Sequence, residues 1–235
     1  GSSNGKGMLA INNRRKPLDD VRVRRAITHA IDREAFIKRM LGGRGKAIGS
    51  HFSPTEAGYV HLTGVNPHNP AKARALLKEA GVKLPLKLTL SLPPTPYART
   101  DRDLLVDALA DVGIQVQTDY LTWPQWLEGP FKGDFDLTMI NHVEPLDYHI
   151  YGDPHYYFGY DSPAFRDLLA RHAAADNARE RQVLFASMQR HLANDAVNAW
   201  IYAAQVTAVS RKELRGWWMS FPILAHDIAA LRWDA

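Results

Sequence analysis

The stretch from Pro85 to Leu121, PLKLTLSLPPTPYARTDRDLLVDALADVGIQVQTDYL, decides the fold class of this chain. Residues 85–93 and 114–121 alternate apolar and polar side chains, which is typical of β-strands. Between them, residues 100–113 have the apolar spacing of a helix, with Thr or Asp at the start as N-cap and a final glycine as stop. This order predicts a βαβ unit with parallel strands and a right-handed crossover.

The chain before this unit is predicted to contribute one strand and two helices. Residues 7–13 are predicted as a short strand, and residues 69–82, with an Asn-Pro start and a glycine stop, as a short helix. Residues 17–43 are predicted as a single helix with Asp19 or Asp20 as its N-cap. Its predicted buried stripe is Val23, Ile27, Ala30, Ile31, Ile37 and Leu41, with Arg22, Arg25, Arg33 and Lys38 on or near the solvated side.

The chain after the unit continues to alternate between helices and strands. The predicted elements are a short helix at 122–131, a strand at 135–143, helices at 162–176 and 178–195, and a strand at 196–210. Residues 214–235 are aromatic and apolar without clear periodicity, so we expect this tail to pack against another surface. The pattern predicts one α/β unit with a mixed sheet flanked by helices.

Length and composition exclude several classes of protein. The chain has 235 residues, a net charge of +4 and no cysteine. The lack of cysteine excludes disulfides, Cys-zinc sites and thiol nucleophiles. No apolar run approaches the roughly 20 residues of a membrane helix, and no signal segment opens the sequence. Gly1 and Ser2 read as a fusion scar, so we expect a mature or excised piece of a protein.

Two further sequence features raise hypotheses that the residue pattern does not favour. Residues 14–46 hold eleven Lys and Arg against four acids, which is typical of nucleic-acid binding. Those basic residues lie around a helix that also buries a face, and no recognition motif accompanies them, so no nucleic-acid partner is predicted. Residues 42–50 are glycine-rich but lack the phosphate-loop pattern, so no cofactor is predicted.

The stretch NHVEPLDYHIYGDPHYYFGYDSP, residues 141–163, combines carboxylates, histidines and five of the nine tyrosines. It follows directly from the predicted strand 135–143. Ligands of open α/β sheets gather outside the carboxyl ends of strands. We therefore expect this stretch to form a ligand-binding surface.

The carboxylates of this stretch allow two kinds of chemistry. Glu144, Asp147 and Asp153 have the side chains that glycoside hydrolysis requires, although sequence spacing does not establish the separation of an acid and a base. Asp153 precedes a proline and reads as a turn residue. A carboxylate that receives a ligand ammonium is the better use of Glu144 or Asp147.

The histidines and tyrosines of the stretch are interpreted differently. His142, His149 and His155 lack the i, i+4 spacing of a zinc helix, so no metal site is predicted. Tyrosine offers a large rigid surface with a hydroxyl group, which suits a ligand wall. Tyr148 and Tyr156 are the predicted ligand residues.

Three segments together resemble extracellular solute-binding family 5, the oligopeptide-, dipeptide- and nickel-type binding proteins of ABC importers. They are residues 12–54, 69–82 and 135–160. The most specific motif is Pro-x-Asp-Asp-Val-Arg-Val-Arg-x-Ala followed by Ala-Ile-Asp-Arg. Because the motif is common to members with different ligands, we expect Arg24, Asp32 and Arg33 to organise the helix and its neighbours.

The resemblance implies a periplasmic-binding-protein-like type II lobe, the second lobe of a two-lobed protein about twice as long. It implies residues 1–12 as the scar and a hinge strand, 13–205 as the second ligand-binding lobe, and 206–235 as a segment that packs toward the first lobe. The expected function is capture of a peptide-like or other small solute and its delivery to ABC permease subunits, in the periplasm and without catalysis. The alternatives are the ligand-sensing effector domain of a regulator and a carboxylate-dependent hydrolase.

In peptide-binding members of that family, the matching strand ends near a tryptophan, and an aspartate soon after it receives the amino group of the peptide. Here His142 stands where the tryptophan would be, and the acid is Glu144 or Asp147. The predicted ligand-binding residues are Asn141, His142, Glu144, Asp147, Tyr148 and Tyr156.

Overall fold

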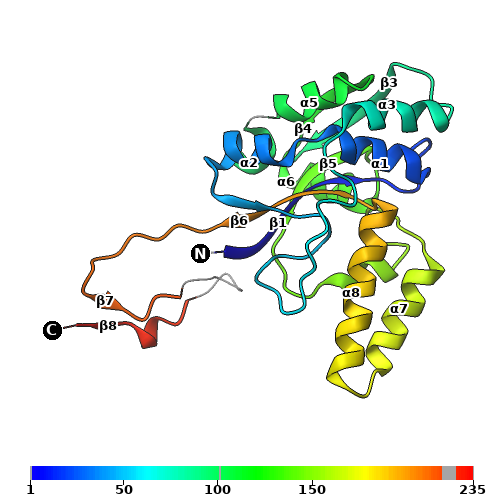
Figure 1. Cartoon of the computed structure of the whole chain (residues 1–235). Helices are drawn as coiled ribbons and strands as arrows, with labels where there is room; N and C mark the ends of the chain where they lie inside the picture. The colour runs from blue at the N-terminus through cyan, green and yellow to red at the C-terminus, as the bar shows by residue number, and fades with distance from the viewer. Residues whose placement is uncertain (1, 101, 219–225, 235) are drawn as a thin grey trace.

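A six-stranded mixed sheet forms the centre of the computed structural model, which describes residues 2–100, 102–218 and 226–234 (Figure 1). Its strands are β1 (Ser2–Ile11), β2 (Gly45–Ala47), β3 (Leu86–Leu92), β4 (Ile114–Tyr120), β5 (Leu137–His142) and β6 (Ala199–Gln205), in the order β2-β6-β1-β5-β3-β4. The helices are α1 (Val21–Ala30), α2 (Arg33–Leu41), α3 (Pro70–Glu79), α4 (Pro96–Arg99), α5 (Asp103–Ala110), α6 (Trp123–Glu128), α7 (Pro163–Ala174) and α8 (Ala178–Asp195). The predicted α/β class with a mixed sheet is confirmed.

The strands of the predicted βαβ unit are parallel neighbours in this sheet. β3 and β4 pair in register from Leu86 opposite Ile114 onward, with α5 between them in the sequence. β5 runs parallel to β3 and antiparallel to β1, so β3, β4 and β5 share one carboxyl edge. α5 begins later than predicted, because Thr100 ends the short helix α4 instead of opening α5. Asp101, the other predicted N-cap, lies outside the described residues.

The helix predicted over residues 17–43 is two helices, so that prediction was wrong. α1 begins after Asp20, which caps it as predicted, and the backbone becomes extended at Ile31. Asp32 then accepts a hydrogen bond from the Ala35 amide at 3.0 Å and starts α2 as its N-cap. The Asp32 cap stabilises the start of a second helix and so favours a break at Ile31. The apolar spacing nevertheless continues across the break.

The predicted position of Arg33 on the solvated side was also wrong. Arg33 is buried, and its guanidinium donates to the carbonyl oxygens of Trp200 at 2.8 Å and Asn66 at 2.9 Å. Arg24 is buried too and donates to the carbonyl oxygen of Leu18 at 3.0 Å. The arginines of the sequence motif therefore tie α1 and α2 to neighbouring segments.

The sheet separates two hydrophobic cores. β1 shows the alternation, because Leu9 and Ile11 join the core on the side of α1, α2, α3 and α5, whereas Met8 and Ala10 join the other. The second core is rich in aromatic side chains and includes residues of the α7–α8 hairpin. Figure 1 shows α3 and α5 on one side of the sheet and the α7–α8 hairpin projecting from the other. Both faces of β1 are therefore buried.

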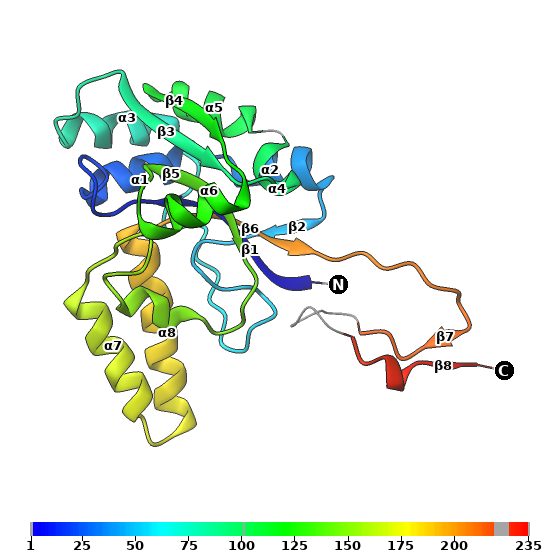
Figure 2. The same cartoon turned by 180° about the vertical axis from the view of Figure 1, so that it is seen from behind.

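The chain leaves the sheet after β6, earlier than the predicted strand end at residue 210. The segment that follows extends away from the sheet and carries the short pair β7 (Leu214–Arg215) and β8 (Arg232–Trp233), together with a 3₁₀ turn at Ile228–Ala230 (Figure 2). Val209 is 95% exposed and Ile228 is 75% exposed. Part of the tail, residues 219–225, lies outside the described residues. The predicted partner surface of this tail and the division of the chain at residues 12 and 205 stay predictions.

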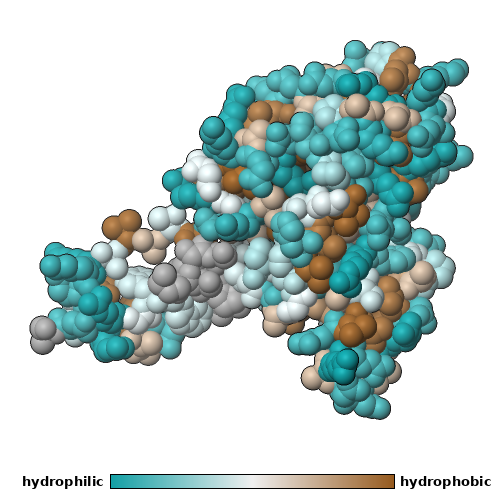
Figure 3. Space-filling view, in the orientation of Figure 1, coloured by the Kyte–Doolittle hydropathy of each residue, from teal (hydrophilic) through white to brown (hydrophobic). Residues whose placement is uncertain are grey.

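The surface contains few large apolar areas on the face seen in Figure 3, where hydrophilic residues dominate and hydrophobic ones gather in small groups. Among the described residues, no helix combines the length and apolarity that a membrane span requires.

Candidate functional site

A cavity of about 430 Å³ lies at the carboxyl end of β5, where the sequence predicts a ligand-binding surface. Its walls come from the end of β5, the loop after it and the aromatic residues of α6 and its neighbours. The lining residues are Trp126, Phe131, Ile140, Asn141, His142, Glu144, Pro145, Asp147, His149, Ile150, Tyr156 and Tyr157. The structure thus brings together five of the six predicted ligand residues.

Tyr148, the sixth predicted residue, lies apart from the other five. Its ring packs edge-on against Phe185 at 5.5 Å and against His172 at 5.6 Å. It lines a different hollow of about 340 Å³, beside α7 and α8. Asp147 and Tyr148 therefore line different hollows, and a ligand-binding role for Tyr148 stays a prediction.

Asp147 is the centre of a buried charged network. Its Oδ1 accepts a hydrogen bond from His51 Nε2 at 2.7 Å and from Lys6 Nζ at 3.3 Å. Its Oδ2 lies 3.3 Å from His142 Nδ1. Lys6 is 0% exposed and the Asp147 side chain is 10% exposed. The carboxylate therefore already has three partners within the chain.

The electrostatics of the network keep Asp147 charged and His51 neutral. Burial opposes the charge of Asp147, but attraction to His51, which is protonated in acid, the hydrogen bonds from both histidines and the positive charge of Lys6 hold its pKa well below the usual range. Burial also lowers the pKa of His51 to about 4, against the opposing effect of the Asp147 carboxylate. A neutral His51 donates its Nε2–H to Asp147 and accepts at Nδ1 from the Tyr151 hydroxyl, 2.8 Å away.

A second tyrosine supports the other histidine. His142 Nε2 lies 3.0 Å from the Tyr157 hydroxyl, and the two rings are stacked at a centroid distance of 6.1 Å. Tyr157 is 2% exposed and lies within the aromatic core. Burial raises the pKa of Tyr157 well above its ordinary value, so its hydroxyl is a neutral donor or acceptor. The side chains of Tyr157 and Tyr151 fix the two imidazoles.

The same cluster has the atoms of a metal site. Among the described residues, His51, His142 and Asp147 each offer one ligand atom, and these atoms lie within 4.8 Å of one another. Lys6, however, already supplies a positive charge to this carboxylate. The arrangement is a compensated hydrogen-bond network. His149 and His155, which the sequence offered as partners of His142, are exposed and outside the cluster.

Sequence reasoning missed Lys6 and His51, which come from distant parts of the chain. Lys6 lies on β1 directly opposite His142 on β5, and His51 lies in the loop after β2. One signal was available for Lys6, because a lysine at the start of a strand that is buried on both faces needs a partner. His51 had no comparable signal.

Glu144 is the exposed acid of the cavity. Its side chain is 64% exposed, and its Oε2 accepts a hydrogen bond from the Val143 amide at 3.0 Å and lies 3.9 Å from His142 Nδ1. Asp153 is exposed and accepts from the His155 amide at 2.8 Å, which agrees with its interpretation as a turn residue. Glu144 therefore remains available to a ligand in a way that Asp147 does not.

The loop that carries both acids is held from two sides. The backbone carbonyl of Glu144 accepts a hydrogen bond from Lys6 Nζ at 2.6 Å. Glu56 accepts from the Leu146 amide at 3.1 Å and from the Ser53 amide at 2.6 Å. Leu146 has a φ of 55°, in the left-handed region that a leucine rarely adopts, so the loop needs these contacts.

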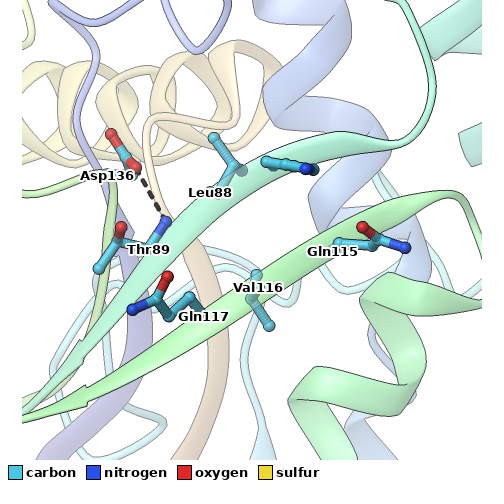
Figure 4. Close-up of a pocket in the computed structure, with 7 residues that line it drawn as sticks. Leu88, Thr89, Gln115, Val116, Gln117 and Asp136 are labelled. Atoms are coloured by element: carbon cyan, nitrogen blue, oxygen red, sulfur yellow. Dashed lines mark hydrogen bonds between the residues drawn. The ribbon is translucent and has the colours of Figure 1, made fainter.

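A third hollow, of about 330 Å³, lies over β3 and β4, and Lys87 and Gln115 are among its lining residues. Figure 4 shows the Thr89 amide donating to Asp136, and the distance is 2.9 Å. Asp136 also pairs with Arg15 at 3.0 Å, so its charge is compensated. This hollow lies away from the carboxyl ends of the strands and contains none of the predicted ligand residues.

Comparison with known proteins shows the family and the fold of the chain. The model of the bacterial extracellular solute-binding proteins, family 5 (Middle), matches residues 1–161. The chain belongs to this family. Its predicted type II periplasmic-binding fold is also confirmed, because a dipeptide-binding protein of Pseudoalteromonas sp. SM9913, solved in complex with Met-Leu, superposes with a TM-score of 0.82 at 21% identity, over 99% of this chain and 49% of that one.

Two curated relatives indicate the range of the family. The dipeptide-binding protein of Escherichia coli K12 is 28% identical over 90% of this family 5 chain and 42% of its own length. The heme-binding protein A of Haemophilus influenzae is 25% identical over 54% of this chain and 24% of its own. The chain spans less than half the length of these relatives.

Proposed function

We propose that this chain is one ligand-binding lobe of the solute-binding component of an ABC importer, and that it captures a peptide-like or other small solute without catalysis. The observation that carries the proposal is the cavity at the carboxyl end of β5, with aromatic walls and one exposed acid. Membership of family 5 and the names of the peptide-binding relatives support it.

In this proposal, Asn141, His142, Glu144 and Tyr156 contact the solute. Asn141 lines the cavity at the end of β5, and its Oδ1 is buried without a hydrogen-bond partner among the described residues. An unpaired buried acceptor is costly, so we expect Asn141 to turn this oxygen toward an N–H of the bound solute. Tyr156 is a neutral aromatic wall, since burial and the nearby acids raise its pKa to about 12.

The remaining parts of the chain have roles in the same proposal. Residues 13–205 form the lobe, and residues 1–12 begin it with a strand that enters from the other lobe. The tail from residue 206 onward packs on that other lobe, which would cover exposed apolar side chains such as Val209 and Trp233. Capture between two lobes and transfer to a membrane permease place the protein in the periplasm or an equivalent extracytoplasmic space.

Isothermal titration of the longer protein, which would contain both proposed lobes, with a set of dipeptides and small cationic solutes tests this function. We expect at least one of them to bind, and binding to weaken by about tenfold or more in Asn141→Ala. Glu128→Gln is the matched control, since Glu128 is an exposed acid that pairs with Lys132 outside the cavity. Equal affinity in this chain alone and in the longer protein would contradict the two-lobe account.

A further inference from the structure

Lys6 occupies the cation position of the cavity's buried acid. Its ammonium group lies between the Asp147 carboxylate, at 3.3 Å, and the backbone carbonyl of Glu144, at 2.6 Å. The side chain is fully buried, so the ammonium group relies on acceptors within the protein. A ligand ammonium that reached Asp147 would have the same kind of contacts as Lys6 Nζ.

We propose that Lys6 is a specificity-determining residue, which excludes ligand ammonium groups from Asp147 and selects solutes whose inserted end is uncharged. This inference deepens the proposed function and rests on it for the identity of the ligand. It differs from the assignment of Asp147 as a ligand residue, because Asp147 here binds an ammonium group that belongs to the protein.

Charge and geometry both support this role. The Asp147 oxygens already face Lys6, His51 and His142, which leaves little room for a fourth donor. A second positive charge near Lys6 would be repelled at close range in a poorly solvated site. Removal of Lys6 would leave a buried carboxylate without a cation, which is a strongly unfavourable state that a ligand ammonium would relieve.

The cavity walls indicate what enters instead. Beyond Asp147, the lining is mainly aromatic and aliphatic, with Trp126, Phe131, Ile140 and Ile150 among its residues. Such a wall favours a neutral, partly apolar group. A positive group on the same solute has Glu144, the exposed acid at the rim, as its partner. The proposed ligand class is therefore a solute with a neutral end inside the cavity and any cationic group near Glu144.

The first test needs no knowledge of the ligand. In Lys6→Ala, the missing part of the side chain has the size and charge of n-propylammonium, which serves as the probe. Titration of the variant, followed by the imidazole resonances of His51 and His142, is expected to show saturable binding at least about tenfold tighter than in the wild type. 1-Propanol, which lacks the charge, and the Lys46→Ala variant, which removes an exposed lysine, are the controls.

If Lys6→Ala does not fold alone, n-propylammonium present during refolding is expected to restore the native spectrum, and 1-propanol is not. Equal binding of n-propylammonium by the wild type and the variant would overturn the proposal, as would a variant that folds and never binds the probe. These outcomes concern Lys6 and Asp147 alone, so they are independent of the transport function.

The second test uses the longer protein, with the dipeptide Ala-Phe and its N-acetyl derivative as probes. The wild type is expected to bind the two within about threefold of each other, and Lys6→Met to favour the free amine by about tenfold or more. The proposal would be overturned if the wild type favoured the free amine tenfold and this preference disappeared in Asp147→Asn. In that outcome Glu144→Gln would keep the preference. Failure of both probes in every variant would count against the peptide-like ligand of the proposed function, and the n-propylammonium result would still decide the role of Lys6.

Discussion

Lys6 and His142 face one another in the antiparallel register of β1 and β5, and both side chains meet at Asp147. Because β1 is a central strand, this pairing carries the start of the chain directly into the candidate site at the end of β5. The loop that carries Glu144 and Asp147 is thereby fixed to the sheet by a buried ion pair, which makes the fold of the chain and the charge of the cavity interdependent.

The first prediction concerns the loss of that ion pair. Asp147→Asn should lower the free energy of unfolding by about 3–5 kcal/mol, because removal of one partner leaves Lys6 as an uncompensated buried charge. Urea denaturation followed by circular dichroism measures the change. Glu144→Gln, a substitution of the exposed acid in the same loop, should change stability by less than about 0.5 kcal/mol. Equal effects of the two substitutions would mean that the ion pair does not stabilise the fold.

The second prediction concerns Arg33, whose guanidinium bonds the carbonyl oxygens of Trp200 and Asn66. Arg33→Met keeps most of the side-chain volume but leaves both buried acceptors without this donor, so the free energy of unfolding should fall by about 2–5 kcal/mol. Thermal and urea denaturation provide the measurement. Lys38→Met is the matched control, since Lys38 is exposed on the same helix. A cost below that of the control would show that Arg33 acts as a surface residue, as its sequence spacing suggested.

The helices and strands of this chain were predictable where one local rule decides them. The strands β3, β4 and β5, the helix α8 and the Asn69 cap of α3 follow from alternation, helical spacing and capping chemistry within a few residues of sequence. The break at Ile31 was not predictable in this way, because the apolar spacing of α1 continues into α2 and Asp32 can cap a helix only once the chain has broken there.

The candidate site was predictable as a location but not as a network. The rule that ligands gather at the carboxyl ends of strands pointed to the end of β5, where the structure has a cavity lined by Asn141, His142 and Glu144. The state of Asp147 depends on Lys6 and His51, which lie 141 and 96 residues away in the sequence. Sequence spacing contains no information on such contacts, so the compensation of Asp147 emerged only from the folded chain.

The third prediction is a loss of stability in acid that depends on His51. The folded-state pKa of His51 is about 4, whereas an unfolded histidine has a pKa of about 6.5. Below pH 6.5 the unfolded chain binds a proton at His51 and the folded chain does not, so unfolding becomes easier as the pH falls. The contribution should be on the order of 3 kcal/mol by pH 4 and absent above pH 7.

Urea denaturation at intervals between pH 7 and pH 4.5 checks this expectation by comparing slopes. His51→Gln removes the titration and should flatten the dependence, although His29 and His172, whose pKa values are also lowered by burial, leave a residual slope. His149→Gln, which replaces an exposed histidine of the same region, should leave the wild-type slope unchanged. Identical slopes for His51→Gln and the wild type would exclude His51 as the source.

The last prediction concerns Glu56, which together with Lys6 holds the loop that carries Glu144 and Asp147. Its two carboxylate oxygens accept from the Ser53 and Leu146 amides, and Leu146 keeps a left-handed φ of 55° between the two acids. Glu56→Gln retains the shape but has only one acceptor oxygen, so one amide loses its partner at a cost of about 1–3 kcal/mol. Relief of the backbone strain then favours a different loop conformation. Amide hydrogen exchange at Leu146 should therefore accelerate about tenfold or more. Exchange in β4, which pairs with β3 and not with β5, should follow only the change in global stability. Glu128→Gln should leave both rates unchanged, and an unaltered exchange rate at Leu146 in Glu56→Gln would mean that Lys6 alone holds the loop.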